Sequence, residues 1–539
     1  MFSIFALSLI VRLAYLMEFP VFRFDELGEN IRAYMILNGF LPLTNNAPFM
    51  GALYNYLAAA AYCVFRDPVA FRLLVALFGS LTPPLLYVLA KKLTRSSITP
   101  LVSALALALM PPHFLIASHV AWSASLTPFF FTLSLLAFIK ALKDDSVPCW
   151  FAFGVTAGLA LQTHPSVLAS YVGAFVGLTY VLGWKKIRDL LTLKHFAILA
   201  TGFLIGYVNM VIFNIIQPFG SIIAIFSAKW TGLGSPLTPA EYVRRLLFLM
   251  GEFISMFPTG IPIITLPHLL KSVVFYVFTA LFSFLIAYSA IRTKLGRGML
   301  LCIGVALLIL AIGTRGAMAL NIFGYAWGPH YLQHLTPMVA LVLGVGSDAL
   351  LKDLRWIRGK VKTPALRKLV EYISKSCILL TLLFVLLWPF ITTLGILAYL
   401  DGAGCTNKPL LKTVEWLKKE FGDEVPVYIA ISEMPSPHLL LYELMVLEEL
   451  RIFPHHDQLF RKLLKEPHEV REYILKEFMR FLDDVKGRGV GVMVVGIDTD
   501  VKDIRQYLLS KGYKVATEYT VSSCFKKPFY KLIVIEFKG

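Results

Sequence analysis

Three carboxylates lie within five residues near the start of the chain, at Asp25, Glu26 and Glu29. The chain is 57% hydrophobic and only 16% charged, so the place where it gathers acids indicates a functional site. A carboxylate there could act as a general base or bind a metal ion. Asp25 and Glu29 would share one face of a helix, whereas Asp25 and Glu26 would point about 100° apart.

These acids also have structural interpretations. Asp25 could cap the helix that follows it by accepting hydrogen bonds from backbone N–H groups. Glu29 could pair with Arg32 three residues later, a surface contact of little energetic worth. We favour a catalytic role for Asp25, because Glu26 and Glu29 bring further acid to a surface of anionic lipid.

The remainder of the chain predicts a polytopic α-helical membrane protein. Its mean hydropathy of +0.69 and its 13% aromatic content exclude a soluble globular protein. A transmembrane helix needs about 20 mostly apolar residues, and about eleven stretches qualify. They are 2–19, 69–90, 97–117, 123–142, 149–163, 166–183, 195–216, 269–291, 298–316, 331–350 and 374–400. The first lacks the basic start and cleavage site of a signal peptide, so we interpret it as an anchor.

The net charge of +17 predicts the topology rather than a nucleic-acid partner. Basic residues gather in short loops, above all between 352 and 368, and such loops stay on the cytoplasmic side. This pattern predicts a multi-pass plasma membrane protein with its N-terminus inside and both the Asp25 loop and the C-terminal tail outside. Segments 25–39, 51–65 and 241–257 are expected to be helices along the outer interface.

The sequence divides into a membrane domain at 1–400 and a small α/β extracytoplasmic domain at 401–539. Helical patterns at 408–421, 466–486 and 501–511 alternate with strand patterns at 425–431, 490–496 and 532–537. No phosphate-binding loop, CxxC pair or nucleophile elbow occurs there, which favours a cap or docking role. Of six cysteines only Cys405 and Cys524 fall in this domain, where an oxidising compartment would allow a disulfide.

The chain resembles GT-C fold membrane glycosyltransferases, close to the protein O-mannosyltransferases and aminoarabinose transferases of glycosyltransferase family 39. The resemblance covers residues 1–220 in ordered blocks and 221–400 by topology alone. The blocks are Phe24-Asp25-Glu26 with Tyr34 and Asn38-Gly39, Gly51-Ala52-Leu53-Tyr54-Asn55-Tyr56-Leu57, Phe71-Arg72-Leu73, His119-Val120-Ala121-Trp122-Ser123 and Gln162-Thr163-His164-Pro165.

This resemblance implies an inverting transfer of a sugar from a polyprenyl- or dolichyl-phosphate donor to a glycan, lipid or protein acceptor. The phosphate leaves without a proton, so one base suffices. We predict Asp25 as that base, with Glu26 orienting the acceptor or a sugar hydroxyl. The predicted substrate-binding residues are Glu29, Tyr34, Arg72, His119, Trp122, His164, Arg315, His330 and Tyr331.

Several of these residues keep alternative roles. Arg72, Arg315 and His330 are candidates for the donor phosphate, or they snorkel to the lipid headgroups. His119 and His164 are structural or contact the sugar, since two histidines without a third ligand make a poor metal site. No metal cofactor is predicted with certainty, and a divalent ion remains an alternative.

The competing function is that of a transporter or flippase for lipid-linked sugars. Transporters commonly show internal repeats and ionisable residues near the middle of the membrane. The two halves of this chain show no repeat, and Arg12 is among the few charges inside the predicted spans. An oligosaccharyltransferase would carry a WWDYG-type segment in its tail, which is absent here.

Overall fold

The computed structural model describes residues 1–19, 22, 24–226, 237–259, 273–313, 319–322, 325–366, 368–372, 376, 379, 387, 391, 406–430, 444–447, 450–453, 470–496, 501–522 and 528–538. Contacts divide the chain into two compact units, and each is described by itself. The first comprises 1–16, 39–61 and 71–396, and the second comprises 17–38, 62–70 and 397–539. The acidic stretch therefore belongs to the same unit as the C-terminal domain, a grouping that the predicted division at residue 400 does not anticipate.

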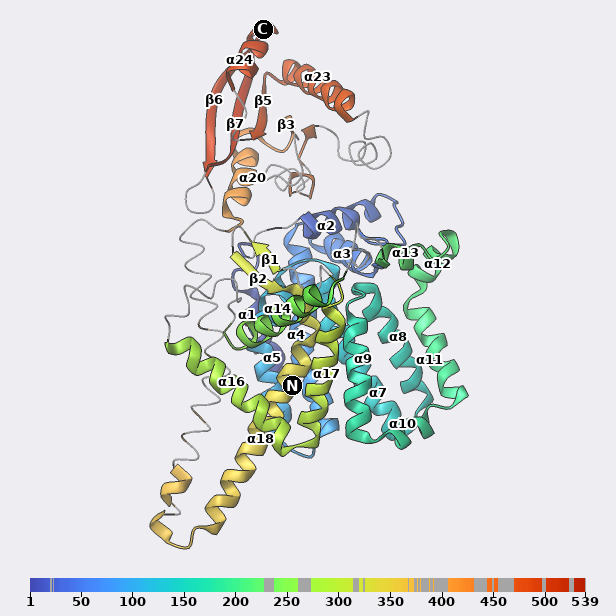
Figure 1. Ribbon diagram of the computed structural model, residues 1–539. Helices are drawn as coiled ribbons and strands as arrows, with labels where there is room; N and C mark the ends of the chain where they lie inside the picture. The colour runs from blue at the N-terminus through green and yellow to red at the C-terminus, as the bar shows by residue number, and fades with distance from the viewer. Residues whose placement is uncertain are drawn as a thin grey trace. The chain divides into compact units, whose positions relative to one another are not determined.

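The first unit is built almost entirely of helices, as the apolar stretches predict (Figure 1). Helices α3 and α4 each have one end in the second unit. The helices are α1 (Phe2–Leu13), α3 (Leu53–Phe65), α4 (Val69–Leu93), α5 (Ile98–Leu109), η1 (Pro112–Ile116), α6 (Ala117–His119), η2 (Ser123–Leu126), α7 (Thr127–Asp144), α8 (Val147–Thr163), α9 (Val167–Leu182), α10 (Trp184–Leu190), α11 (Leu193–Gly206), α12 (Val208–Ile216), α13 (Gly220–Phe226), α14 (Pro239–Thr259), α16 (Val273–Arg292), α17 (Lys294–Leu310), η5 (His330–Leu335) and α18 (Thr336–Lys360). A short hairpin of β1 (Ala319–Ile322) and β2 (Tyr325–Pro329) precedes η5.

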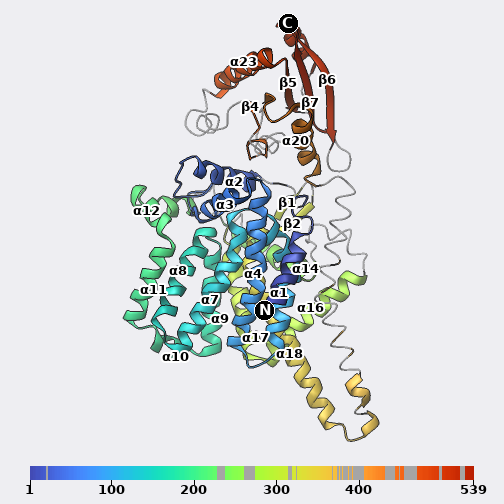
Figure 2. The same cartoon turned by 180° about the vertical axis from the view of Figure 1, so that it is seen from behind.

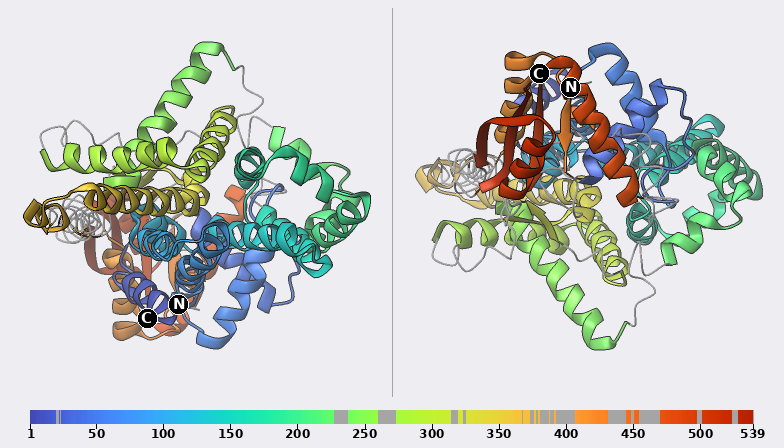
Figure 3. Two further views of the ribbon diagram at one scale, coloured as in Figure 1. Left: turned by 90° about the horizontal axis from the view of Figure 1, so that it is seen from below. Right: turned by 90° about the horizontal axis from the view of Figure 1, so that it is seen from above.

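Close approach at glycine holds neighbouring helices of this unit together. A Cβ atom on Gly206 of α11 would lie 2.1 Å from the Val155 carbonyl oxygen of α8. A Cβ atom on Gly177 of α9 would lie 2.2 Å from the Gly298 carbonyl oxygen of α17. Membrane helices associate through such small residues because lipid gives no hydrophobic drive between them. The end-on view of Figure 3 shows these helices packed side by side.

Three described helices are long and apolar enough to cross a membrane, namely Val69–Leu93, Ser123–Asp144 and Leu332–Lys360. The number rises to as many as six if each of three bent pairs is one span. The pairs are Ile98–Leu109 with Pro112–His119, Leu193–Gly206 with Val208–Ile216, and Thr279–Arg292 with Lys294–Leu310. The expected stretch 374–400 lies largely outside the described residues, so about eleven spans stays a prediction.

The first apolar stretch is not one continuous helix over 2–19, and that expectation is wrong. Helix α1 ends at Leu13, because Ala14 is extended and Tyr15 has a left-handed φ of 56°. The predicted interfacial segments, in contrast, are helical as α2 (Phe24–Leu37), α3 and α14. Helix α14 crosses α17 and projects away from it (Figures 1 and 3), and its place at a membrane interface stays a prediction.

The second unit contains the predicted small α/β domain together with α2. Its five-stranded sheet has the order β4-β3-β5-β7-β6. Strands β4, β3 and β5 are parallel, and β7 runs antiparallel to both β5 and β6 (Figure 2). The elements are α20 (Lys408–Phe421), β3 (Val427–Ile429), β4 (Ile452–Phe453), α23 (Val470–Arg488), β5 (Val490–Gly496), α24 (Val501–Ser510), β6 (Tyr513–Ser522) and β7 (Pro528–Phe537).

Helices cover both faces of this sheet. Phe481 of α23 and Leu508 of α24 join Ile533 and Ile535 of β7 in one buried cluster. The alternate residues of β7 face α20, where the Thr413 and Tyr530 hydroxyls lie 2.7 Å apart. Sequence periodicity therefore predicts α20, α23, α24, β3, β5 and β7, but it misses β4 and β6. Cys405 and Cys524 lie outside the described residues, so their disulfide stays a prediction.

Candidate functional site

The acidic residues lie on the first two turns of α2 and differ in their exposure to solvent. Asp25 is exposed, whereas Glu26 and Glu29 are 0% and 2% exposed. Residues three apart share a helix face, so Glu26 and Glu29 form a buried acidic face with Asp25 at its exposed edge. Asp25 and Glu29, which the sequence places on one helix face, therefore differ in exposure, and a divalent ion between them stays an alternative. Among the described residues, no three His, Cys, Asp or Glu side chains group to hold a metal ion.

Glu29 acts electrostatically on Arg32, as the pairing alternative suggested. Burial lowers the pKa of the Arg32 guanidinium, and the negative charge of Glu29 opposes that shift. Glu29 is buried, so this pair is not the weak surface contact that the sequence suggested. The buried Glu29 therefore stabilises the charge of the half-buried Arg32 one turn after Glu26 and Asp25.

The segment that leads into α2 is held by Asn407, which immediately precedes α20. Its side-chain Nδ2 donates to the Met17 carbonyl oxygen at 2.7 Å, and its Oδ1 accepts from the Phe22 N–H at 2.7 Å. Its backbone N–H donates to the Glu18 carbonyl oxygen at 2.8 Å. Asn407 is fully buried, so one residue of the C-terminal domain fixes the entry to the acidic helix. Sequence reasoning missed it, because its partners are nearly 400 residues away.

The far part of α2 is also attached within the same unit. Tyr34 lies edge-on to Tyr62, with ring centroids 6.1 Å apart. The Tyr62 hydroxyl donates to the Leu447 carbonyl oxygen at 2.7 Å. Tyr34, predicted to bind substrate, therefore also packs against a residue that anchors the C-terminal domain.

Arg72 lies in α4, in the part of that helix that belongs to the first unit. It is 1% exposed, and its Nη1 donates to the Leu16 carbonyl oxygen at 2.8 Å. A snorkelling arginine would extend its head group to water, so the snorkelling interpretation is wrong for Arg72. Burial instead fixes the guanidinium where the chain leaves α1.

His119 and Arg12 belong to a buried polar cluster around η1. The sequence did not predict the contacts of Arg12 in this cluster. Arg12 is 0% exposed, and its Nε donates to Ser118 Oγ at 2.8 Å while Nη1 donates to Ser8 Oγ at 2.6 Å. Both ring nitrogens of His119 contact backbone carbonyls, Phe114 at 2.8 Å and Ala14 at 3.1 Å. These contacts support the structural role for His119 over the sugar-contacting one.

Three of the five predicted sequence blocks contact one another within the first unit. The Gly51 N–H donates to the Gln162 carbonyl oxygen at 2.9 Å, and the Tyr54 hydroxyl donates to the Ala121 carbonyl oxygen at 2.7 Å. Trp122, next to Ala121, is buried. Blocks separated by more than 60 residues in the sequence thus form one structural layer.

Two histidines lie in this layer. His164 is half-buried, and its Nδ1 lies 2.7 Å from Ser166 Oγ. The buried His334 contacts Ser170 Oγ through its own Nδ1 at 2.7 Å. Sequence reasoning missed His334, although it lies four residues after His330. Arg315 is outside the described residues, and His330 and Tyr331 belong to η5 but their side chains are not described.

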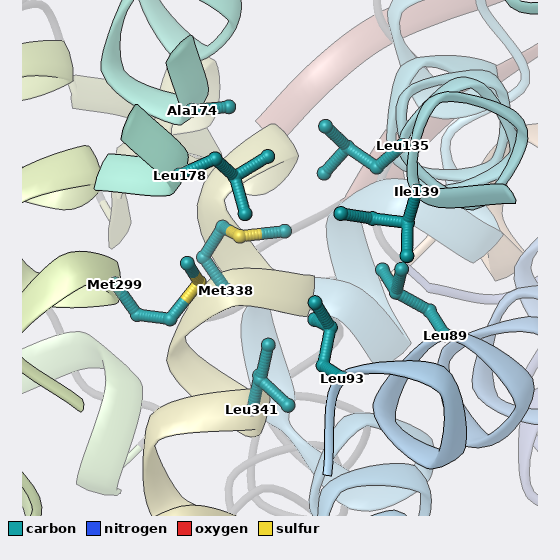
Figure 4. Close-up of a pocket in the computed structure, with 9 residues that line it drawn as sticks. All are labelled: Leu89, Leu93, Leu135, Ile139, Ala174, Leu178, Met299, Met338 and Leu341. Atoms are coloured by element: carbon teal, nitrogen blue, oxygen red, sulfur yellow. The ribbon is translucent and has the colours of Figure 1, made fainter. Parts of the chain in front are cut away.

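Two hollows in the first unit differ in size, and only the larger one has space for a ligand. The centre of the bundle, where α4, α7, α9, α17 and α18 meet, leaves only about 10 Å³ between nine apolar side chains (Figure 4). A second apolar hollow of about 340 Å³ lies between α7, α8, α9 and α11. It extends from Leu161 and Leu168, beside the turn between α8 and α9, to Leu191 before α11, and it includes Ala157.

Comparisons with known proteins agree with the resemblance seen in the sequence. Residues 2–218 match the profile of a family described as dolichyl-phosphate-mannose-protein mannosyltransferase. ArnT from Cupriavidus metallidurans in the apo state has a TM-score of 0.59 at 15% identity, covering 99% of this chain and 97% of its own. The chain has the GT-C fold.

Further comparisons add to this GT-C assignment or leave it unchanged. ArnT from the same organism bound to undecaprenyl phosphate gives a TM-score of 0.59 at 14% identity, covering 99% of this chain and 97% of its own. The Archaeoglobus fulgidus oligosaccharyltransferase tethered with an acceptor peptide gives a TM-score of 0.47 at 15% identity. The match covers 84% of this chain and 63% of the oligosaccharyltransferase. A search among curated proteins finds no match.

Proposed function

We propose that this protein is an inverting membrane glycosyltransferase that moves a sugar from a polyprenyl-phosphate donor to an acceptor on the outer face of the plasma membrane. The observation that carries the proposal is the acidic helix α2 within the region that matches the mannosyltransferase family. An ArnT chain with the same fold was solved with undecaprenyl phosphate, which supports a donor of that class. The N-terminus is then cytoplasmic, and the C-terminal domain is outside.

Asp25 is the general base in this proposal, because its carboxylate is exposed to an incoming acceptor while the neighbouring acids are buried. Asp25 takes the proton from the acceptor hydroxyl as its oxygen attacks the anomeric carbon. The bond from that carbon to the phosphate oxygen breaks, and the electron pair leaves with the phosphate. A base in this role contributes typically about 10²–10⁴-fold to the rate. Glu26 orients the hydroxyl from the buried side of the same turn.

The donor lipid requires an apolar groove and a positive charge. The hollow that includes Ala157 supplies apolar walls along α8 and α9 for an isoprenoid chain. Arg72 is the candidate partner of the leaving phosphate, because a fixed guanidinium stabilises charge that develops in the transition state. Arg315 and His330 remain further candidates for this role.

The test is transfer by the purified protein in detergent micelles, with a series of labelled polyprenyl-phosphate sugars and a pool of glycan, lipid and peptide acceptors. Micelles contain no second leaflet, so a flippase would yield no product there. We expect a covalent product whose anomeric configuration, read by NMR, is opposite to that of the donor. Donor that binds but is never transferred to any acceptor class would refute the assignment, and retained configuration would refute the inverting mechanism.

A further inference from the structure

The C-terminal domain contains a hollow for which neither the transfer chemistry nor the donor gives a role. It has a volume of about 500 Å³ and lies between α20 and the β6–β7 pair. Ligand pockets in proteins have volumes of about 300–1,000 Å³. The hollow is therefore large enough to hold a small molecule or part of a polymer.

The lining combines positive charge with aromatic rings. Lys408, Lys412 and Trp416 follow one another at four-residue spacing, which places them along one face of α20. Tyr519 of β6 lies against Trp416, with ring centroids 5.3 Å apart and ring planes at 68°. Tyr519 is 45% exposed, so part of its ring remains open to a ligand. Among the described residues that line the hollow there is no carboxylate.

The walls of the hollow are fixed by packing beneath them. The Thr413 hydroxyl lies 2.7 Å from the buried Tyr530 hydroxyl, which joins α20 to β7. Trp416 also meets Phe421 edge to face, with centroids 5.4 Å apart. Its indole is therefore held between two rings, and a ligand would find a formed surface rather than one that must first be ordered.

We propose that this hollow binds an anionic saccharide, a sugar that carries a carboxylate or phosphate group, as part of the acceptor. The negative face of an aromatic ring attracts the polarised C–H groups of a sugar ring. The ammonium groups of Lys408 and Lys412 form charge-assisted hydrogen bonds to the acidic group. Aromatic rings and amines together thus select a ligand that has both a ring to stack and a negative charge. The assignment to the acceptor rests on the proposed transferase function, whereas binding itself does not.

Asn407 connects the hollow to the segment that precedes the acidic helix. Thr406 and Lys408 both line it, and between them stands Asn407, which holds Met17 and Phe22. These two residues belong to the segment that leads into α2. A saccharide bound on α20 is therefore held by the same element that fixes the entry to the predicted catalytic turn.

The experiment measures binding to the full-length protein in detergent with no donor present. The anionic probes are tetragalacturonate and a phosphorylated mannotetraose, and the neutral probe is the unphosphorylated mannotetraose. Two further probes carry charge without a sugar ring: tetraglutamate and short-chain phosphatidylglycerol. The variants are Lys412→Glu and Trp416→Leu, with Lys476→Glu on the exposed side of α23 as the matched charge-reversal control. Circular dichroism melts check that each variant is folded.

We expect at least one anionic saccharide to bind wild type about tenfold more tightly than the neutral probe. Lys412→Glu and Trp416→Leu should each weaken this binding about tenfold, and Lys476→Glu should leave it unchanged. Failure of both anionic saccharides to bind overturns the proposal, as does equal loss in Lys476→Glu. Equal binding of tetraglutamate or of phosphatidylglycerol also overturns it, in favour of an acidic peptide or a lipid surface. Sugar transfer to a separate acceptor is assayed in parallel, so failure of this site and failure of the transferase assignment give different results.

Discussion

Asn407 should control how firmly the segment before the acidic helix is held. Changing Asn407 to Ala removes two side-chain hydrogen bonds, a part-buried one to the Met17 carbonyl oxygen and a buried one from the Phe22 N–H. A lost buried bond costs about 1 kcal/mol, and each group left without a partner adds to that cost. We therefore expect the segment to lose about 2–3 kcal/mol of local stability, which is about a 30- to 150-fold change in its opening equilibrium.

Hydrogen exchange read by mass spectrometry measures this opening directly, because exchange of protected amides follows local opening. Peptides that cover residues 17–24 should exchange about 30- to 150-fold faster in Asn407→Ala, while peptides of α7 and α8 should not change. Asn407→Asp keeps the acceptor for the Phe22 N–H but loses the donor to the Met17 carbonyl oxygen. Its exchange rate over residues 17–24 should therefore lie between those of wild type and Asn407→Ala. Unchanged exchange over 17–24 would refute the structural role given to Asn407.

The matched control for this series is Asn38→Ala. Asn38 makes an exposed hydrogen bond from its Nδ2 to the Tyr34 carbonyl oxygen at 3.1 Å, at the other end of α2. A surface change of this kind costs within about 0.5 kcal/mol. If Asn38→Ala accelerated exchange over residues 17–24 as much as Asn407→Ala does, the loss of any hydrogen bond near α2 would destabilise this segment, and Asn407 would have no special role.

Three further predictions concern the first unit. Ala157→Trp should fill the hollow between α8 and α9 and lower the turnover of long-chain donors more than that of short-chain donors. Val172→Trp, on the exposed side of α9, is the control. Equal effects on both chain lengths in a donor-length series would contradict the role of the hollow as a donor groove. Gly206→Ala should lower the melting temperature, because overpacking costs about 1–3 kcal/mol. Gly304→Ala should not, because the space around its Cβ is open. A lower melting temperature for Gly304→Ala than for Gly206→Ala in scanning fluorimetry would contradict the close helix contact at Gly206. Cysteines placed between 352 and 368 should resist an impermeant label added outside intact cells; rapid labelling there would reverse the topology.

Local patterns in the sequence were sufficient for elements whose signal is periodic. The apolar and charged residues of 408–421 alternate with a helical period, and the runs at 490–496 and 532–537 are rich in β-branched residues, so α20, β5 and β7 were predictable. Strand β6 was missed because Lys514, Thr517 and Glu518 dilute its apolar pattern. They are tolerated because β6 is the edge strand of the sheet, with one hydrogen-bonded neighbour.

The ends of elements and the distant contacts were not predictable in this way. Residues 14–19 remain largely apolar after α1 has ended, because apolar character favours the membrane interior without specifying where the backbone leaves the helix. The depth of Arg12 depends on Ser118, more than 100 residues away. Asn407 and the buried side of Glu26 likewise depend on tertiary contacts that no local pattern encodes.

The acidic cluster itself was found from the sequence, but its internal division was not. Composition indicated the stretch, because acids are scarce in so apolar a chain. Which acid faces outward follows from what covers α2, and the structure exposes Asp25 while burying Glu26 and Glu29.

The most direct test of the account is sugar transfer by purified Asp25→Asn, compared with wild type, Glu26→Gln and Glu29→Gln at matched folding. Asp25 lies exposed in the first turn of α2, where the loss of a negative charge costs about 0.3–1 kcal/mol, so the stability of Asp25→Asn should fall only slightly. Its transfer rate should fall by about 10²–10⁴-fold with donor still bound, since the base is missing. Glu26→Gln should lose less activity and Glu29→Gln less again. Full transfer activity in Asp25→Asn would contradict the central claim, and an equal loss in all three variants would replace the single base with a shared metal ion.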